Sequence, residues 1–363
     1  MSAGGAVAGA GPLVLVLNAG SSSLKAKLLD SGGQVLWKGH TDWHPNAPEA
    51  SSGPHGAATA ATGVLRDWLL PAIAPWDTSV ALVGHRVVHG GTAFTAPTRL
   101  TAPVRAQLAE LTPLAPLHNG PALAVIEALG AWRPELPQWA CFDTAFHHTL
   151  PPEAHTYAIP ATWRQQGLRR YGFHGLNHQH VSEVVRVSRL ISCHLGAGCS
   201  LAAIADGRSI ATTMGFTPME GLVMASRSGS VDPGLLLHLL RQGVSAKDLD
   251  HALNQASGLL ALSDGLSTSM KDLRQAAAAG HGGAAMAIAV FRHGLLQAIG
   301  AMAASLGGVD AIALTGGIGE HDEALRQELA AALTWLGSFA LVVVPADEEG
   351  LIARQCRVGA GLA

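Results

Sequence analysis

Two glycine-rich turns, one near each end of the chain, have the residue types of a phosphate-binding loop. The first follows an apolar run at 13–17 and reads Asn18-Ala19-Gly20-Ser21-Ser22-Ser23-Leu24-Lys25; the second follows 311–314 and reads Thr315-Gly316-Gly317-Ile318-Gly319-Glu320. Small residues let backbone N–H groups approach phosphate oxygens, and the lysine and hydroxyls add charge and donors. Neither turn is a G-x-x-x-x-G-K-[ST] or G-x-G-x-x-G loop, so each taken alone also fits an ordinary tight turn.

Other polar residues gather in five short clusters at the expected ends of strands and starts of helices. Glycine beside a charged side chain lets backbone and ligand come close, as a binding site requires. On a nearly neutral chain, such clusters favour a local anion site over scattered surface charge. Their central residues are Arg86, His118, Asp143, His174 and Arg227.

A third glycine turn indicates an internal repeat. Residues 191–207 repeat the layout of the first turn: a strand, a small-residue turn, a Ser-Leu pair and a second strand. The Ser-Leu pairs begin at Ser23 and Ser200, 177 positions apart, and a strand followed by a polar loop recurs 173 positions apart, at Asp143 and Gly316. Two nearly equal offsets predict a duplication in which each half opens on a hairpin and closes on a strand and loop.

Length and composition agree with two α/β domains and exclude two kinds of partner. The chain has 363 residues, of which 48% are hydrophobic, enough for two buried cores. Its 23 Lys and Arg against 26 Asp and Glu leave no broad electrostatic surface for nucleic acid or a membrane. We therefore expect neither as a partner, and any functional cation must act locally.

The cysteines and the apolar runs predict a cytoplasmic protein. The four cysteines form no C-x-x-C pair, and three adjoin apolar strand residues, which favours buried, reduced thiols. Residues 1–12 lack the basic and apolar regions of a signal peptide. From Met286 to Leu306 apolar residues recur at helical spacing, but Arg292 and His293 interrupt them, so a buried helix is favoured over a membrane span.

Ten short runs, in order over almost the whole chain, together form a specific pattern. They are NAGSSSLK from Asn18, GHRVVHGG from Gly84, LHNGPAL from Leu117, FDTAFH from Phe142, YGFHG from Tyr171, CHLGAG from Cys193, FTPMEGL from Phe216, RSGSVDPG from Arg227, GGIGE from Gly316 and PADEE from Pro345. With these runs the chain resembles the acetokinase (acetate kinase) family, a group within the sugar kinase, heat-shock cognate and actin superfamily. The resemblance is more specific than any periodicity.

The resemblance implies an α/β fold of two duplicated RNase H-like (βββαβα) domains, with the active site in the interdomain cleft. The N-terminal domain would span residues 1–146 and be closed by the C-terminal segment 348–363. The nucleotide-binding domain would span residues 147–347. Relatives in this family are usually homodimers, so a homodimer is expected by resemblance.

The implied activity is a reversible, Mg²⁺-dependent transfer of the ATP γ-phosphoryl group to acetate, giving acetyl phosphate and ADP, with Mn²⁺ as an alternative metal. Such a transfer needs positioning and charge neutralisation more than covalent help. By resemblance the catalytic residues are Asp143, Arg86, Arg227 and His174. An arginine fork suits carboxylate and phosphoryl oxygens. Because a carboxylate nucleophile is already ionised, Asp143 need not act as a strong base.

The resemblance also assigns the binding sites. The carboxylate would be bound by Arg86, Val88, Leu117, His118, Phe173 and Pro218. The nucleotide would be bound by Lys25, His194, Leu195, Gly196, Ala197, Gly198, Ser269, Met270, Lys271, Gly316, Gly317, Ile318, Gly319 and Glu320. The metal would be held by Asn18 and Glu348, with Glu349 as the alternative to Glu348.

Three segments depart from the family pattern. The adenosine loop, usually S-D-M-R, is Thr268-Ser269-Met270-Lys271; H-L-G-N-G has become H-L-G-A-G from His194; and R-S-G-D has become Arg227-Ser228-Gly229-Ser230. The lost carboxylate and the Arg-to-Lys exchange in the adenosine loop predict weak discrimination between nucleotide bases.

Three other functions stay open at the level of sequence. A propionate or butyrate kinase of the same family would differ in its acyl pocket. A nucleotide-binding regulator without turnover would suit the altered adenosine loop. A metallohydrolase would suit three histidines, His174, His178 and His180, together with Asp143 and His147-His148. The sequence also leaves the base preference and the physiological direction open.

Overall fold

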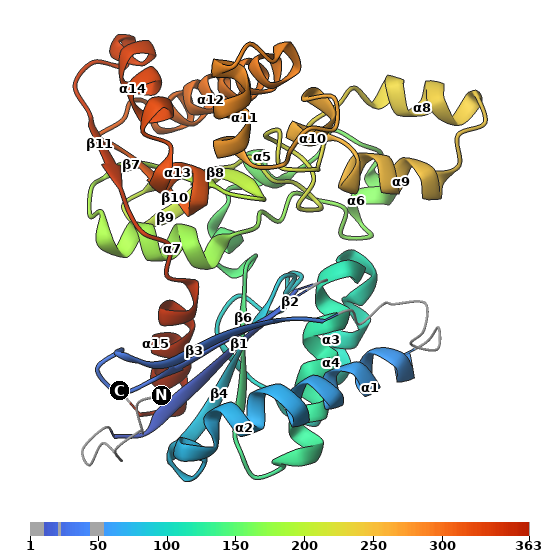
Figure 1. Ribbon diagram of the computed structural model, residues 1–363, viewed down its shortest axis with the longest axis vertical. Coiled ribbons are helices and arrows are strands. Elements are labelled where there is room, and N and C mark those ends of the chain that lie inside the picture. The colour runs from blue at the N-terminus through green and yellow to red at the C-terminus, as the bar shows by residue number, and fades with distance from the viewer. Residues whose placement is uncertain (1–10, 21–22, 44–53, 363) are drawn as a thin grey trace. The chain divides into compact units, whose positions relative to one another are not determined.

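The computed structural model describes residues 11–20, 23–43 and 54–362 and, within these, all side chains except those of 54–58, 113, 116 and 117. The chain forms two compact units (Figure 1). Unit 1 comprises Met1–Ala145 together with Asp347–Ala363, and unit 2 comprises Phe146–Ala346. Each unit is built around one β-sheet. The last segment, Asp347–Ala363, returns to the unit that contains the start of the chain.

Unit 1 contains a six-stranded mixed sheet in the order β3-β2-β1-β4-β6-β5. Its strands are β1 (Leu13–Ala19), β2 (Ser23–Leu29), β3 (Val35–Asp42), β4 (Val80–Val87), β5 (Thr98–Arg99) and β6 (Gln138–Phe142). β1, β2 and β3 are antiparallel neighbours, whereas β4 pairs parallel with β1 and β6 parallel with β4. Because parallel strands end at one edge of a sheet, the residues that follow β1, β4 and β6 lie near one another.

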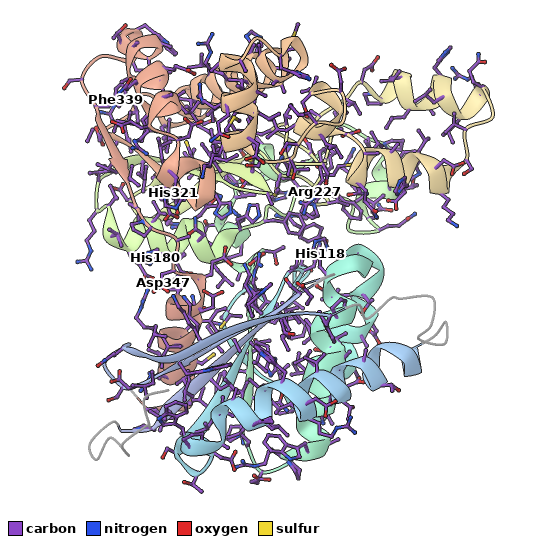
Figure 2. The ribbon with its side chains drawn as sticks, viewed as in Figure 1. His118, His180, Arg227, His321, Phe339 and Asp347 are labelled. Carbon is purple, nitrogen blue, oxygen red and sulfur yellow. The ribbon has the colours of Figure 1, made fainter. Side chains whose placement is uncertain are left out.

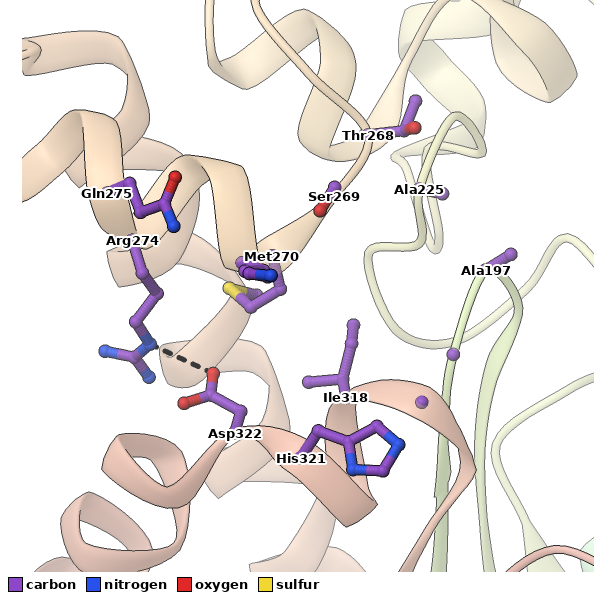
Figure 3. Close-up of a pocket in the computed structure, with 13 residues that line it drawn as sticks. Ala197, Ala225, Thr268, Ser269, Met270, Arg274, Gln275, Ile318, His321 and Asp322 are labelled. Atoms are coloured by element: carbon purple, nitrogen blue, oxygen red, sulfur yellow. Dashed lines mark hydrogen bonds and ion pairs between the residues drawn. The ribbon is translucent and has the colours of Figure 1, made fainter.

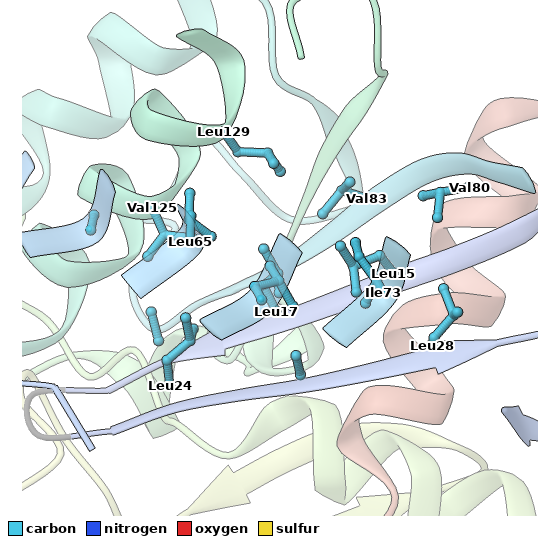
Figure 4. Close-up of a cluster of buried hydrophobic side chains, with 14 of the residues drawn as sticks. Leu15, Leu17, Leu24, Leu28, Leu65, Ile73, Val80, Val83, Val125 and Leu129 are labelled. Atoms are coloured by element: carbon cyan, nitrogen blue, oxygen red, sulfur yellow. The ribbon is translucent and has the colours of Figure 1, made fainter. Parts of the chain in front are cut away.

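Helices cover both faces of this sheet. They are α1 (Pro54–Val64), η1 (Leu65–Leu69), α2 (Leu70–Ile73), η2 (Ala74–Ser79), α3 (Ala102–Glu110), η3 (Thr112–Leu114), α4 (Pro116–Trp132) and α15 (Glu348–Ala360). Alternate residues of β1, Leu15 and Leu17 among them, pack with Leu65 and Val125 in the core on one face (Figure 4). On the opposite face α15 packs on β1, β4 and β6.

A glycine in β4 allows α15 to lie close to the sheet. A Cβ at Gly84 would come within 2.7 Å of Ile352 Cγ2 and 2.9 Å of Cys356 Sγ. Any other residue at this position would push the helix away, since core atoms are already in contact. The strand itself is continuous from Val80 to Val87.

Unit 2 contains a five-stranded mixed sheet in the order β11-β10-β7-β8-β9. Its strands are β7 (Arg189–Leu195), β8 (Cys199–Ala205), β9 (Arg208–Thr212), β10 (Ala311–Thr315) and β11 (Ala340–Val343). The remaining elements are η4 (Ala145–Thr149), α5 (Pro152–His155), α6 (Ala161–Arg164), α7 (Gly175–Val184), α8 (Pro233–Arg241), α9 (Ala246–Gln255), α10 (Gly258–Leu262), α11 (Met270–Ala278), α12 (Gly282–Leu306), α13 (Gly316–His321), α14 (Glu323–Ala332) and η5 (Thr334–Leu336). Figure 1 shows α7 on one side of this sheet and α12 on the other.

The two sheets share one topology. In each, three antiparallel strands are followed by two parallel ones, so β1, β2, β3, β4 and β6 correspond to β7, β8, β9, β10 and β11. The pairing of Ser23 with Ser200 is consistent with this correspondence, because both lie at the start of the second strand. The pairing of Asp143 with Gly316 is wrong. Asp143 follows β6, which corresponds to β11, whereas Gly316 follows β10, which corresponds to β4. Both segments are a buried parallel strand followed by a polar loop, so sequence alone could not distinguish them.

The long apolar helix α12 packs on the sheet of unit 2. In the described part of the chain it is the one helix long and apolar enough to cross a membrane. Its residues Phe291, Leu295 and Ile299 are buried, and it contacts β8 and α11. This arrangement agrees with the buried helix that the sequence favoured.

Candidate active site

Arg86 and Asp143 form a buried ion pair where β4 and β6 end. Arg86 is the next-to-last residue of β4, and Asp143 directly follows β6. The guanidinium donates from Nε to Asp143 Oδ1 over 3.0 Å and from Nη2 to Oδ2 over 2.5 Å. Two parallel hydrogen bonds fix both the position and the plane of the guanidinium.

Asn18, Glu348 and Glu349 bring further oxygen atoms to this ion pair. Arg86 Nη1 donates to Asn18 Oδ1 over 3.3 Å, and Asn18 Nδ2 donates to Glu349 Oε1 over 3.4 Å. Glu348 Oε2 lies 3.5 Å from Arg86 Nε. The two glutamates open α15, so the C-terminal helix delivers its first turn to the ends of β1 and β4. Both candidates for the metal ligand therefore lie in this cluster, Glu348 beside Arg86 and Glu349 beside Asn18.

Negative charge exceeds positive charge in this cluster. The carboxylates are those of Asp143, Glu348 and Glu349; the cations are Arg86 and Lys27, whose Nζ lies 3.0 Å from Glu349 Oε2. Burial raises the pKa of Asp143 to about 6, with Arg86 opposing the rise and Glu348 adding to it. Burial by itself lowers the pKa of Arg86, but the attraction of Asp143 and Glu348 raises it overall. Oxygen ligands and excess negative charge suit a hard divalent cation such as Mg²⁺, which takes one or two carboxylates from the protein and its other ligands from phosphates and water. No three carboxylates of the described residues are arranged to hold an ion by themselves.

Buried hydrogen bonds fix the loop that carries Val88. Asn119 Oδ1 accepts from the His89 N–H over 3.0 Å, and Asn119 Nδ2 donates to the His89 carbonyl over 2.9 Å. The Gly90 N–H donates to Thr144 Oγ1 over 3.0 Å. These bonds tie the loop after β4 to α4 and to the loop after β6, so Val88, which is buried, has little freedom to move.

The other residues predicted to bind the carboxylate are divided between the two units. Leu117 and His118 belong to α4, which begins at Pro116. The side chain of Leu117 is outside the described ones. Phe173, fully buried, and Pro218 belong to unit 2.

In unit 2, His174 and Arg227 approach the same glycine; Arg227 is labelled in Figure 2. His174 precedes α7 with a left-handed φ of 55°, which is uncommon for a residue other than glycine. A Cβ at Gly198 would lie 3.1 Å from His174 Nε2 and 3.7 Å from Arg227 Nη1. Arg227 Nη1 also donates to the Pro218 carbonyl over 2.8 Å. Gly198 thus leaves open the space that the imidazole and the guanidinium both adjoin.

Unit 2 contains a cavity of about 550 Å³, large enough for a nucleoside (Figure 3). Its walls are the turn between β7 and β8, the start of α11 and the start of α13. The lining residues are Gly196, Ala197, Ala225, Thr268, Ser269, Met270, Lys271, Arg274, Gln275, Gly317, Ile318, His321 and Asp322. The structure thereby brings the second and third glycine turns to one cavity with the altered adenosine loop.

Half of the residues predicted to bind the nucleotide line this cavity and half do not. Those that line it are Gly196, Ala197, Ser269, Met270, Lys271, Gly317 and Ile318. Those that do not are His194, Leu195, Gly198, Gly316, Gly319, Glu320 and Lys25. Glu320 Oε1 instead accepts from the N–H groups of Gly316, over 2.9 Å, and Ala346, over 3.0 Å, so it holds the turn in shape.

Lys25 belongs to unit 1, whereas the residues that line the nucleotide-sized cavity belong to unit 2. It lines a separate cavity of about 430 Å³ on β2 and β3, together with Lys27, Lys38, His40 and Glu349. The first glycine turn, which precedes Lys25, includes Ser21 and Ser22, and these two residues are outside the described ones.

Sequence reasoning missed the polar side chains Arg274, Gln275, His321 and Asp322 of the cavity. Arg274 Nε donates to Asp322 Oδ2 over 2.9 Å, drawn dashed in Figure 3, and Nη1 donates to Glu328 Oε1 over 2.8 Å. Two sequence signals could have found them. Arg274 lies one helical turn beyond Lys271, and His321 and Asp322 directly continue the glycine turn.

Ser269 does not simply replace the family's aspartate as a ligand group. Its hydroxyl accepts from the Asp272 N–H over 3.4 Å and so caps the N-terminus of α11. The hydroxyl of Ser267 bonds to Asp272 Oδ2 over 3.1 Å and accepts from the Ser269 N–H over 3.0 Å. The altered adenosine loop is therefore a helix cap as well as a cavity wall.

The histidines of unit 2 do not form the metal centre of a metallohydrolase. No group of three or more His, Cys, Asp or Glu side chains within residues 11–20, 23–43 and 54–362 could hold a metal ion. His147 and His178 are bonded through Nδ1 to Ser209 and Ser192, each over 2.8 Å. Burial lowers the pKa of His147 to about 4 and that of His178 well below its usual value.

Comparison with known proteins identifies close relatives. The family model described as "Acetokinase family" matches residues 13–348. An acetate kinase of Synechococcus sp. (strain JA-2-3B'a(2-13)) is 45% identical over 354 residues, covering 89% of this chain and 88% of the relative. An acetate kinase of Gloeobacter violaceus is 41% identical over 407 residues, covering 94% and 98%.

Solved structures show the same similarity. Porphyromonas gingivalis acetate kinase superposes with a TM-score of 0.83 at 32% identity, covering 96% of this chain and 99% of that one. A propionate kinase from Francisella tularensis superposes with a TM-score of 0.85 at 32% identity, covering 95% and 98%. A putative N-acetylmannosamine kinase from Listeria monocytogenes, 12% identical with a TM-score of 0.51, shares the fold alone.

Proposed function

Because the chain belongs to the acetokinase family, we propose that it transfers the γ-phosphoryl group of ATP to acetate, reversibly giving acetyl phosphate and ADP. Within the structure, the observation that carries the proposal is the nucleotide-sized cavity of unit 2, bordered by two glycine turns. Backbone N–H groups at such turns suit the phosphates. The unit 1 cluster supplies the arginine and carboxylate that a phosphoryl transfer to a carboxylate needs.

Arg86 and Arg227 would stabilise the negative charge that develops on the phosphoryl and carboxylate oxygens. A guanidinium has five N–H donors, so Arg86 can engage Asp143 with two of them and still offer others. Asp143 would hold that guanidinium in one plane. Proton abstraction is not needed, because a carboxylate substrate is already ionised at neutral pH. His174 would add a donor beside Arg227, where Gly198 leaves room for a phosphoryl group.

Asn18 and Glu348, with Glu349 as the alternative, would hold Mg²⁺, or Mn²⁺ in its place. Their oxygen atoms and the surplus of negative charge in the cluster fit such a cation. When bound, the metal would neutralise phosphate charge. The chain's own residues orient the carboxylate and the transferring group.

A propionate kinase is the second candidate function, and it would differ from an acetate kinase in the length of the acyl chain that it accepts. A propionate kinase and an acetate kinase superpose on this chain at the same 32% identity. Val88 is the residue of the predicted pocket whose surroundings the structure describes most fully. If it contacts the methyl end of acetate, shortening it should favour longer acids, by about 0.8 kcal/mol for each additional buried CH₂.

The deciding experiment is a steady-state panel of acetate, propionate and butyrate with ATP, followed by ADP release. The proposal expects turnover that requires a divalent metal and is highest with acetate. A Val88→Ala variant should shift the ratio of kcat/KM values toward propionate and butyrate. A folded protein that binds ATP but releases no ADP with any of the three acids would contradict the proposal and favour a nucleotide-binding regulator.

We also propose a homodimer in the cytoplasm. The family resemblance supports the dimer. The four cysteines are free and buried, which agrees with a reducing compartment. Neither a nucleic acid nor a membrane is expected as a partner. Light scattering of the purified protein tests the oligomeric state.

A further inference from the structure

A continuous line of hydrogen bonds runs through the interior of unit 2 and ends at His174. Ser192 Oγ lies 2.8 Å from His178 Nδ1, and His178 Nε2 lies 2.8 Å from Ser200 Oγ. Ser200 Oγ lies in turn 2.9 Å from His174 Nδ1. The hydroxyl of Ser200 thus joins two imidazoles, one in the interior and one beside the phosphate-binding turns.

Each member of this line is held by secondary structure. Ser192 is on β7, Ser200 is on β8, and His178 is on the first turns of α7, which packs on β7. Ser192, Ser200 and His178 are all fully buried. Because these side chains are on rigid elements and have no contact with water, each hydroxyl and imidazole nitrogen cannot freely change between donor and acceptor.

His174 is held in a conformation that its own backbone does not favour. Its φ of 55° is left-handed, and its ring stacks on that of His194 with centroids 4.3 Å apart. Strain of this kind persists only where the surroundings impose it, and it concentrates at functional positions. The bond from Ser200 is one of the contacts that impose the ring's orientation.

The Ser200 hydroxyl has one hydrogen, and the two imidazoles are the partners that the structure gives it, so two polarities satisfy every donor of the line. In one, Ser192 donates to His178 Nδ1, His178 Nε2–H donates to Ser200, and Ser200 donates to His174 Nδ1. In the other, every bond is reversed and His174 Nε2 carries a lone pair. Both keep the imidazoles neutral, which agrees with the lowered pKa of His178, buried among other histidines.

The ligand expected beside His174 selects the first polarity. This step rests on the proposed function, in which a phosphoryl group occupies the space left by Gly198. Phosphoryl oxygens are acceptors, so the nitrogen that faces them must carry hydrogen. Of the two neutral tautomers, only the one that carries Nε2–H can donate to those oxygens, alongside the Arg227 guanidinium near the same glycine.

We propose that Ser200 is a positioning residue: its hydroxyl accepts from His178 Nε2–H and donates to His174 Nδ1, which locks His174 in the tautomer that presents Nε2–H to the transferring phosphoryl group. His178 and Ser192 set the direction of the Ser200 hydroxyl. Ser200 touches neither substrate. Its contribution is to remove the tautomer that could not donate.

The kinetic test compares Ser200→Ala with Ser209→Ala. Ser209 is a matched control because it is also a fully buried serine bonded to a buried histidine, His147, but it lies outside the line. Ser200→Ala should lower kcat by about 10- to 100-fold, less than removal of the donor itself, with the KM values for ATP and acetate changed by no more than about twofold. Ser200→Thr, which keeps the hydroxyl, should recover most of the loss. Equal, near-normal kcat values for both alanine variants would overturn the proposal.

A second measurement does not depend on activity and reads the tautomers in the wild-type protein. In protein labelled with ¹⁵N-histidine, long-range proton-nitrogen spectra distinguish the two neutral tautomers, and signals missing in His174→Gln and His178→Gln give the assignments. The proposal expects Nε2–H at both histidines in the wild-type protein. Nδ1–H at His174 would overturn it. A wild-type protein without acetate kinase activity but with Nε2–H at both would contradict the proposed function alone.

Discussion

At the scale of single residues, the two arginines differ in what surrounds them. Arg86 is engaged by a buried carboxylate on one side and a second carboxylate at 3.5 Å, whereas Arg227 donates to a backbone carbonyl. Removing Arg86 leaves the charge of Asp143 buried and unpaired, which costs stability as well as any catalytic contact. The two substitutions should therefore have distinguishable effects.

We expect Arg86→Ala and Arg227→Ala each to lower kcat by on the order of 10²- to 10³-fold, because each removes a charge-assisted contact that strengthens as charge develops. Arg86→Ala should also lower Tm, whereas Arg227→Ala should lower it less. Arg66→Ala is the control, since Arg66 forms an exposed ion pair with Asp67. Steady-state kinetics and thermal unfolding of the same samples check both effects. Turnover near that of the wild type in either folded variant would exclude that arginine from the mechanism.

The altered adenosine loop predicts a second residue-scale effect. Ser269 and Lys271, which stand where the family pattern has an aspartate and an arginine, both line the cavity, and the Ser269 hydroxyl is occupied as a helix cap. We expect GTP and ITP to support turnover within roughly tenfold of ATP, equivalent to less than about 1.4 kcal/mol of base discrimination.

The paired substitutions Ser269→Asp and Lys271→Arg should then sharpen the preference for ATP. Aspartate also caps helices well, so α11 should stay intact in the double variant. Circular dichroism verifies the helix content, and kcat/KM with the three nucleotides gives the selectivity. A wild-type preference for ATP of a hundredfold or more would mean that other residues, Arg274 among them, read the base.

At the scale of elements, the sequence predicted the equivalence of the hairpins that open the two halves but matched the wrong parallel strands. The antiparallel hairpins of β1 with β2 and β7 with β8 were recognisable, because alternation and a conspicuous Ser-Leu pair mark them. The parallel strands β4, β6 and β10 are short and mostly buried apolar runs, and β11 is a short apolar run at the edge of its sheet. Only their neighbours in the sheet tell them apart, and those neighbours are far away in sequence.

The residues of the candidate site also divide into those that the sequence predicted and those that only the fold reveals. The family motifs indicated Arg86, Asp143 and Arg227, and the structure puts the first two in direct contact. Ser200 and Arg274 matter through partners that the fold supplies from distant segments, Ser192 with His178 in one case and Asp322 in the other. The spacing of residues in the sequence does not predict which side chain becomes such a hydrogen-bond partner.

Buried histidines packed on both sheets should make the protein acid-sensitive. Burial lowers the pKa of His85, His89 and His147 to about 4 and that of His178 well below its usual value. The unfolded chain takes up protons near pH 6.5, but the folded chain does not until about pH 4. The contribution of these histidines to the free energy of unfolding is therefore fully present above pH 6.5 and is lost as the pH decreases toward 4. Asp143, whose raised pKa makes the folded state bind a proton first, offsets part of this loss.

Urea unfolding at pH 7.5, 6 and 5 measures the effect, with a lower midpoint expected at each step. His85→Gln should reduce the dependence on pH, because it removes one buried imidazole that the unfolded chain protonates. His40→Gln, at an exposed position, should leave it unchanged. A midpoint that stays constant from pH 7.5 to 5 would show that these histidines take up protons without unfolding the chain.

At the scale of the whole molecule, unit 1 depends on the last segment of the chain. α15 packs on β1, β4 and β6 and buries Leu351, Ile352 and Cys356. A protein ending at Ala346 should therefore have a disordered unit 1 and retain a folded unit 2 that still binds ATP. Limited proteolysis with mass spectrometry locates the protected residues, and calorimetry measures the binding. A control that ends at Ala360 keeps α15 and should resemble the full chain. Protection of residues 80–142 in the shorter protein would show that α15 is dispensable for the sheet.

The place of α15 also has a consequence for biosynthesis. The strands of unit 1 leave the ribosome first, but the helix that completes their sheet follows about 200 residues later. At 5–20 residues per second, the sheet of unit 1, whose last strand ends at Phe142, waits roughly 10–40 s for the helix that covers the surface around Gly84. Unit 2 is contiguous and meets no such delay. The half of the protein made second should thus finish folding first, and the nascent N-terminal half is where chaperones would be needed.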